Sequence, residues 1–479
     1  DDDPLQLARL YEKLEERDIA LGQCEQICRL EQTRDALSKE LLGDHHGALK
    51  LYAELMNTEE SEGFESCEVL PTEVEKKQWE TGYINCVRGL LAWTNLKTNI
   101  EADFDRIDEI WDFATHGKSR LQHYMRALVG LTTKPSTEGP ELVAWVDDCW
   151  SNETLADRRH VLETEFGIET SLALLLDQHK DPAMAKELLK REKDRFLSIW
   201  SDNIGPVVKR DQLRRLHRVI ELDEYVRVVV DNVDGAHDLI SAWSERIPSH
   251  GDDDKDSWDF VLTNRISLCT RLKQVCNLSQ SVKHAINASI AKLYLSMAKV
   301  ALAQTSTTVA EPYLDQALKW DRSDLSTLHY SLGKVKLLMA QSGDATLTTK
   351  AQLSILQDAN DVLSAEETLL MSSSTFDCAK YHSLWGQLLG RMLEMQEKAG
   401  VRGISVESVT EKFSQALKLT EADVSCRSLA PKVLFKLAMF CDRTADRDKD
   451  MPECGSPVVW MYIDSMLRAM ALGAAKASQ

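Results

Sequence analysis

The sequence predicts an all-α protein, an α-α superhelix (solenoid) of TPR-like and HEAT-like helical hairpins. Gly (21) and Pro (11) are scarce, aromatic residues make up only 6%, and long amphipathic windows are filled with Leu, Ala, Glu, Lys and Gln. This is the residue usage of helical proteins. The chain has 479 residues, more than the roughly 250 to 300 at which a single core stops growing. We therefore expect an elongated array of hairpins.

The first hairpin is predicted around GDHHGALKLYAEL, residues 43–55. Apolar residues recur at helical spacing on both sides of the Gly-Asp pair, which predicts a turn between two helices. A small residue at Ala48 and an aromatic one at Tyr52 is the pattern by which TPR-type helices approach closely. His45 and His46 could be metal ligands, but no HExxH motif or second ligand pair accompanies them. We interpret both histidines as solvated residues of the turn.

Two stretches reveal weak internal repetition. Residues 313–325 and 412–424 share the letters QALK and a later Asp at a constant offset of 99 residues, and each follows an apolar helical stretch. A third hairpin is predicted over residues 166–197, where Asp181-Pro182 ends one helix and starts the next. The array is therefore expected to consist of diverged helix-turn-helix units.

Turn-forming residues predict the loops between hairpins, at residues 57–66, 132–140, 246–257, 341–346, 398–403 and 446–457. None of these stretches has the composition of a long flexible linker. We therefore predict one continuous helical-repeat region over residues 1–479. Its expected sub-blocks are TPR-like hairpins at 1–135, helical hairpins at 136–250 and TPR-like hairpins at 251–479.

The charge balance limits the expected partners. The formal net charge is −20, from 57 basic and 77 acidic residues, which argues against a broad nucleic-acid interface because phosphate binding needs Lys and Arg. The basic run KRDQLRRLHR, Lys209 to Arg218, is interpreted as a solvated helix face. We therefore expect little direct nucleic-acid binding by this segment.

The cysteines and the chain start give two further expectations. Eleven cysteines are scattered without a CxxC pair, and no signal peptide is recognised, so reduced thiols in a reducing intracellular compartment are predicted. No apolar run is long enough to span a membrane. The sequence starts with DDDPLQL and lacks an initiating Met, which suggests a segment of a larger protein.

The best lead for an enzyme is DDDKD, residues 252–256. This run fits the DDxxD pattern with which all-helical terpenoid synthases hold magnesium, because carboxylates a turn apart can share a hard cation. An enzyme would need Asp252, Asp254 and Asp256 to face a cavity. Flanking Ser and Gly residues instead predict a charged loop whose last acid caps the next helix. No phosphate-binding glycine loop and no HRD or DFG motif is present. We therefore predict no catalytic, cofactor-binding or metal-binding residue in this chain.

Two predicted helices contain specific residues that an amphipathic packing pattern alone does not require. Residues 71–96 predict one helix opened by a capping box of Thr72 and Glu75, with large apolar residues on one face. In the second stretch, residues 257–272, Ser257 or Asp256 is expected to cap a helix that buries its apolar face.

The identity and order of residues in these and other stretches match a known family. The matching residues, in chain order, are Pro71-Thr72-Glu73, Glu75-Lys76, Trp79, Cys86, Leu90, Trp93, Leu96, Ile110-Trp111, Tyr124-Met125, Trp258-Asp259, Thr263-Asn264-Arg265, Leu437-Ala438 and Phe440-Cys441-Asp442. Together they resemble the FAT region of the PI3-kinase-related kinase family, and most closely that of its DNA-dependent members.

The resemblance implies a curved α-solenoid that clamps a C-terminal kinase domain and adjoins a HEAT-type solenoid. It further implies a nuclear Ser/Thr kinase that uses ATP and magnesium, is brought to DNA ends by the Ku heterodimer, and serves double-strand break repair by non-homologous end joining. No catalytic residue of that kinase can be carried over to this chain. The open alternatives are the FAT region of another family member, a free-standing TPR-like adaptor and an all-α metal-dependent enzyme.

Overall fold

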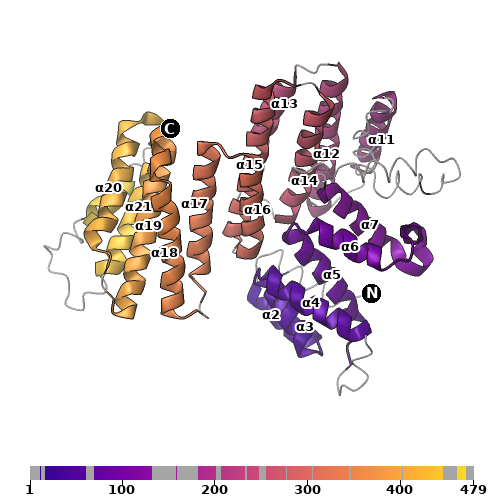
Figure 1. The fold of residues 1–479 in the computed structure, drawn as a ribbon, viewed down its shortest axis with the longest axis horizontal. Helices are drawn as coiled ribbons and strands as arrows, with labels where there is room; N and C mark the ends of the chain where they lie inside the picture. The colour runs from indigo at the N-terminus through magenta and orange to yellow at the C-terminus, as the bar shows by residue number, and fades with distance from the viewer. Residues whose placement is uncertain are drawn as a thin grey trace. The chain divides into compact units, whose positions relative to one another are not determined.

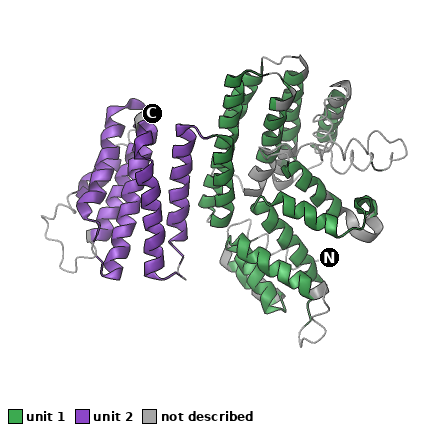
Figure 2. Ribbon diagram, viewed as in Figure 1, with its two compact units in different colours: residues 1–321 green, residues 322–479 purple. Residues whose placement is uncertain are grey.

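A computed structural model gives the fold of the chain. Apart from the isolated residues 11 and 158, the structure describes residues 17–60, 70–131, 182–200, 206–231, 235–247, 255–276, 278–304, 306–344, 347–401, 403–445 and 461–470. These residues form two compact units, residues 1–321 and residues 322–479 (Figure 2). Each unit is described by itself.

The described residues of unit 1 form a succession of helices (Figure 1). Its elements are α2 (Arg17–Ile27), α3 (Glu31–Leu41), α4 (His45–Glu60), α5 (Glu73–Gly89), α6 (Trp93–Ala102), the 3-10 helix η1 (Ile107–Trp111), α7 (Phe113–Leu131), α11 (Pro182–Trp200), α12 (Pro206–Asp231), α13 (Ala236–Glu245), α14 (Lys255–Val275), α15 (Gln280–Ala303) and α16 (Thr307–Trp320).

Unit 2 is built in the same way. Its elements are α17 (Asp324–Gln341), α18 (Thr349–Ala365), η5 (Glu367–Ser372), α19 (Thr375–Ala399), α20 (Val406–Ala422), η6 (Val424–Cys426) and α21 (Ala430–Ala445). Residues 461–470 are also helical.

Most helices pack chiefly on the next helix along the chain, as α3 does on α4, α15 on α16 and α19 on α20. This nearest-neighbour packing is characteristic of helical repeats. No strand occurs in the described ranges. The predicted all-α array of helical hairpins is therefore confirmed. Within the same ranges, no helix combines the length and apolar character needed to cross a membrane.

The close approach predicted at Ala48 and Tyr52 is confirmed. Both side chains of α4 are fully buried, in a cluster that also contains Trp79 and Cys86 of α5. Tyr52 lies over Gly82, where an added Cβ would collide with its ring. The Tyr52 hydroxyl donates a 2.7 Å hydrogen bond to Glu40 of α3, so one side chain connects three successive helices.

The prediction of one helix over residues 71–96 is wrong at its C-terminal part. The Thr72–Glu75 capping box is present as predicted, but α5 ends at Gly89. Leu91 then adopts a left-handed backbone conformation with φ 53°, and a new helix, α6, starts at Trp93. A single non-glycine residue in this conformation breaks the helix, and apolar spacing alone does not reveal it.

Three further boundaries correct the sequence reading. The predicted loop at 57–66 overlaps α4, which continues to Glu60. Helix α14 begins at Lys255, so neither Asp256 nor Ser257 is its cap. The third hairpin has its second helix at Pro182 as predicted, whereas its first helix lies outside the described residues. The predicted loops at 132–140 and 446–457 also lie outside them.

The two stretches related by the 99-residue offset adopt equivalent structures. One lies in α16 and the other in α20, and each helix packs on the long helix before it, α15 or α19. Leu314 and Ala317 of α16 are buried at the positions that Phe413 and Ala416 occupy in α20. The repeated letters therefore record a repeated packing position.

Unit 2 has one continuous apolar core. It joins buried side chains of α17 to α21, including Leu328, Leu363, Leu388 and Phe413, and Met461 and Tyr462 pack against it. Gly400 ends α19 in the left-handed conformation at φ 68°, which glycine adopts without a steric penalty. The core and this turn hold α19, α20 and α21 together around the groove described below.

Candidate functional site

The adjacent histidines do not both lie in a solvated turn. His45 is the first residue of α4 and is buried with 4% exposure, whereas His46 is exposed. An added Cβ on Gly89 would meet the His45 ring at 2.7 Å, and the His45 backbone N–H donates to Thr308 of α16. The prediction was therefore wrong for His45, because a contact 263 residues away in sequence buries it.

The basic run on α12 is also only partly a solvated face. Arg218 is buried with 6% exposure, and Lys209 lies over the Trp200 ring at 5.4 Å from its centroid. The side chains of Arg210, Arg214 and Arg215 lie outside the described residues. The run therefore contributes at least one residue to packing between helices, which charge patterning does not indicate.

The side chains of the aspartate run at residues 252–256 lie outside the described residues. Asp252 and Asp254 lie outside the described residues, and Asp256 lies in the first turn of α14 with its side chain also outside them. No group of three or more His, Cys, Asp or Glu side chains in the described ranges is arranged to hold a metal ion. The predicted charged loop is wrong for residues 255–256, which belong to α14, whereas the predicted absence of a metal site stays a prediction.

A buried charged network connects α12, α13 and α14. The Arg265 guanidinium pairs with Glu221, and its Nη1 donates to the backbone carbonyl of Trp243 at 2.8 Å. His217 lies 2.9 Å from the same Glu221 oxygen. Arg265 and Glu221 are almost completely buried. One ion pair therefore joins three helices through groups that have no access to water.

The environment of Glu221 favours its charged form. Burial acts to raise the pKa of this carboxyl, but the hydrogen bond from His217 and the charge of Arg265 outweigh it, so the pKa is lowered. Nearby, burial raises the pKa of the Cys269 thiol to about 12, which keeps it protonated. A neutral thiol is a poor nucleophile, so the arrangement is structural.

A second polar connection lies between α5 and the start of α3. Glu75 is fully buried and accepts hydrogen bonds from the backbone N–H groups of Arg29 and Leu30, at 2.8 and 3.0 Å. Trp79 donates from its indole nitrogen to Thr33 at 2.9 Å. Both side chains therefore anchor α5 to the start of α3.

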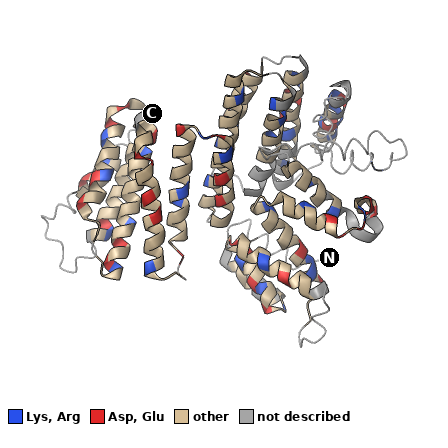
Figure 3. Ribbon diagram, in the orientation of Figure 1, with Lys and Arg blue, Asp and Glu red and all other residues tan. Residues whose placement is uncertain are grey.

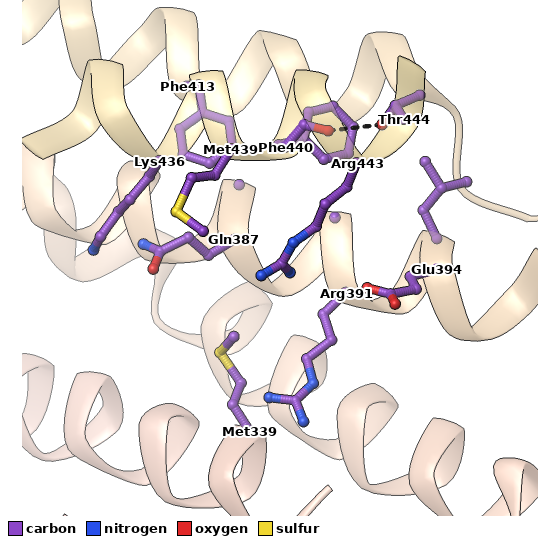
Figure 4. A pocket seen from close by; sticks show the side chains of 13 residues that line it. Met339, Gln387, Arg391, Glu394, Phe413, Lys436, Met439, Phe440, Arg443 and Thr444 are labelled. Atoms are coloured by element: carbon purple, nitrogen blue, oxygen red, sulfur yellow. Dashed lines mark hydrogen bonds between the residues drawn. The ribbon is translucent and has the colours of Figure 1, made fainter. Parts of the chain in front are cut away.

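Unit 2 contains an open cavity of about 220 Å³ between α17, α19, α20 and α21 (Figure 4). Its apolar lining includes Met339 of α17, Phe413 of α20 and Phe440 of α21. Gly386 and Gly390, one turn apart on α19, leave space for the two rings, since an added Cβ would approach them to 2.9 and 3.0 Å. We call this cavity and its rim the unit 2 groove.

The rim of the unit 2 groove is mainly cationic. Arg391 of α19 and Lys436 and Arg443 of α21 line it, together with the single acid Glu394. Figure 4 shows Lys436 and Glu394 at opposite ends of the cavity. Glu394 pairs with Lys398 at 3.4 Å. The charge of the rim is therefore positive, although Lys, Arg, Asp and Glu are interspersed elsewhere along the helices (Figure 3).

The pKa shifts agree with clustered positive charge. Burial lowers the pKa of Arg391 and outweighs the charge of Glu394, which acts to raise it, and the charge of Arg443 lowers it further. Burial likewise lowers the pKa of Lys336 on α17, and Lys436 adds to the effect. Arg443 therefore disfavours the charged form of Arg391, and Lys436 disfavours that of Lys336. Such a cluster would be relieved by a negatively charged ligand.

The sequence analysis missed the unit 2 groove. Its residues come from α17, α19, α20 and α21 and are spread over roughly a hundred positions, from Met339 to Thr444. The only local signal is on α21, where Lys436, Met439 and Arg443 recur at three- and four-residue spacing. That spacing predicts a mixed basic and apolar face. Only tertiary packing adds Arg391 and the glycines of α19.

Comparison with known proteins gives a consistent picture. A FAT domain is matched over residues 150–479. The DNA-dependent protein kinase catalytic subunit of Mus musculus is 26% identical over 286 residues, which cover 56% of this chain and 7% of that protein. That of Canis lupus familiaris is 24% identical over 288 residues, or 57% of this chain and 7% of that protein.

A third relative extends over more of the chain. The DNA-dependent protein kinase catalytic subunit of Dictyostelium discoideum is 23% identical over 417 residues, which cover 82% of this chain and 9% of that protein. The matched parts thus span only 7 to 9% of the length of these relatives.

Proposed function

Because the chain belongs to the FAT-domain family, we propose that it is a non-catalytic helical scaffold that clamps the kinase domain of a DNA-dependent protein kinase-like Ser/Thr kinase. The family resemblance drawn from the ordered residue matches is confirmed by the FAT match. The observation that carries the proposal is this match over residues 150–479 together with relatives named as catalytic subunits of a DNA-dependent protein kinase.

The packing supports a scaffold. Most helices contact chiefly their neighbours in the chain, so small rotations at successive hairpins add up along an array. The buried Glu221–Arg265 pair resists such rotation at α12 to α14. In the proposed mechanism, a change of curvature in the array biases the attached kinase domain between a restrained and an active arrangement.

The wider role follows from the same premise. The parent kinase would use ATP and magnesium in its own kinase domain, with no cofactor held by this segment. Its partners would be the adjoining HEAT-type solenoid, the Ku heterodimer and DNA ends, and it would act in the nucleus in non-homologous end joining. The acidic segment itself would bind little nucleic acid, since its formal charge is −20.

The decisive experiment is to read the coding sequence beyond residue 479. The proposal expects a kinase domain with HRD and DFG motifs downstream. A protein that stops near Gln479 would instead be a free-standing TPR-like adaptor. A kinase domain with the sequence features of a different family member would retain the scaffold role and exclude the role in end joining.

The enzyme alternative has its own test. Asp252, Asp254 and Asp256 would be changed together to Asn, and magnesium binding by the chain would be measured by calorimetry. The scaffold proposal expects no magnesium binding at micromolar concentrations in either protein. Saturable binding that the triple change abolishes would support a metal-dependent enzyme.

A further inference from the structure

The unit 2 groove has the shape and charge of a docking site. An apolar cavity of about 150 Å³ is large enough to bind benzene. The cavity of about 220 Å³ can therefore take one Phe or Leu side chain. Met439, at the edge of the groove, is 41% exposed in spite of its apolar character. An apolar side chain from a partner would remove this surface from water.

The spacing of the rim cations indicates the form of the partner. Lys436 and Arg443 are seven residues apart on α21, so they lie on one face, separated by about 10 Å at 1.5 Å per residue. Two carboxylates seven residues apart on a second helix have the same separation. An apolar residue between them would face Met439 and enter the cavity.

Charge complementarity selects an acidic partner. The rim presents three cations, Arg391, Lys436 and Arg443, and one acid, Glu394. The charge of Glu394 attracts Arg391. The one acid of the rim, Glu394, already has Lys398 as its partner. A basic or neutral helix would leave the clustered cations uncompensated, whereas an acidic helix would pair with them.

We propose that the unit 2 groove binds an acidic amphipathic helix of a partner protein. One apolar side chain of that helix enters the cavity beside Met339, Met439 and Phe440, and its carboxylates pair with Lys436, Arg443 and Arg391. This surface deepens the proposed scaffold function and rests on it only in part, because the groove belongs to this chain whether or not a kinase domain follows.

The test uses the chain of residues 1–479 and a fluorescein-labelled peptide of about 18 residues, which spans about 27 Å as a helix. The peptide carries Glu at positions i and i+7 and Leu and Phe at i+3 and i+4. Fluorescence anisotropy would give its affinity. We expect binding at micromolar concentration, and weaker binding at higher salt because rim charges are screened.

Variants separate the groove from general charge effects. Lys436→Glu/Arg443→Glu is expected to weaken binding at least about 10-fold, since two attractive pairs become repulsive. The control Lys350→Glu/Arg427→Glu makes the same charge change at exposed positions of unit 2 and is expected to leave affinity within about 2-fold. Met439→Glu tests the apolar contact independently.

A charge swap guards against misfolding of the variant. A peptide with Lys in place of both Glu residues is expected to bind Lys436→Glu/Arg443→Glu more tightly than it binds the unaltered chain. Equal loss of affinity in the control variant, or failure of the unaltered chain to prefer the acidic peptide over the basic one, would overturn the docking proposal. The scaffold proposal is decided separately, by the coding sequence beyond residue 479.

Discussion

Within each unit a different contact between helices is the most sensitive to substitution. In unit 1, the junction of α12, α13 and α14 depends on the buried pair Glu221–Arg265. In unit 2, the helices share a continuous cluster of Leu, Val, Met and aromatic side chains. A buried ion pair tolerates substitution poorly, because removal of one partner leaves the charge of the other uncompensated. An apolar core tolerates rearrangement better. The comparison predicts where each unit is vulnerable.

The largest effect is expected for Arg265→Met. This change removes the cationic partner of the buried Glu221 and leaves it only the contact with His217, which destabilises by about 3 to 5 kcal/mol. Hydrogen exchange of α12, α13 and α14, followed by mass spectrometry, would show the loss of protection. The double variant Glu221→Met/Arg265→Met is expected to recover part of the stability. A single variant as stable as the unaltered chain would contradict the role of the pair.

The second effect is expected in unit 2 for Leu388→Ala. Leu388 is fully buried in the shared apolar cluster, and truncation leaves a cavity that costs about 3 kcal/mol. Chemical denaturation monitored by the fluorescence of the neighbouring Trp385 would measure it. Leu388→Met, which keeps the volume, is the control and is expected to cost less than about 1.5 kcal/mol. Equal losses would show that the position does not depend on packing.

A smaller effect is expected at the cap of α5. Thr72→Ala removes the hydroxyl that accepts from the Glu75 backbone and is expected to cost about 1 kcal/mol. Thr72→Ser keeps the hydroxyl and serves as the control. Exchange rates at the first turn of α5 are the measurement. Glu75 would still bond the Arg29 and Leu30 backbones, so protection lost throughout α3 would contradict this division of roles.

The smallest effect is a pH dependence in unit 2. Burial acts to raise the pKa of Asp377, but hydrogen bonds from Ser374 and His329 outweigh it, and the pKa falls below its ordinary value of 3.8. A lowered pKa means that this contribution to stability is complete above about pH 4 and is lost as the pH falls further. We expect less than about 1 kcal/mol, because His329 is partly exposed.

The variant Asp377→Asn provides the measurement for this pH effect. Unfolding of unit 2 would be followed between about pH 6 and pH 3, since the ordinary value lies in that range. The variant is expected to lose less stability than the unaltered chain over the acid part of this range. Identical profiles for the two proteins would show that Asp377 does not contribute. Acid sensitivity that increases in the variant would reverse the sign of the argument.

Much of the fold could be predicted because it depends on neighbours in sequence. The capping box of Thr72 and Glu75, the close approach at Ala48 and Tyr52, and the repeated packing of α16 and α20 all follow from local spacing. The burial of His45 and Arg218 could not be predicted. It depends on packing between helices, for His45 with α16 at the other end of unit 1 in sequence, and a periodic pattern does not contain that information.

The sequence by itself determined the helical class, the hairpin units and the family. Amphipathic periodicity, capping residues and the identity and order of the buried anchor residues can all be recognised in the sequence. Only the tertiary structure decided that α5 ends at Gly89, that Glu221 pairs with Arg265, and that Arg391, Lys436 and Arg443 surround one cavity. The physical reason is that these residues are far apart in the sequence. Residues from several helices become one site only when packing brings them together, and their charges and volumes then act jointly.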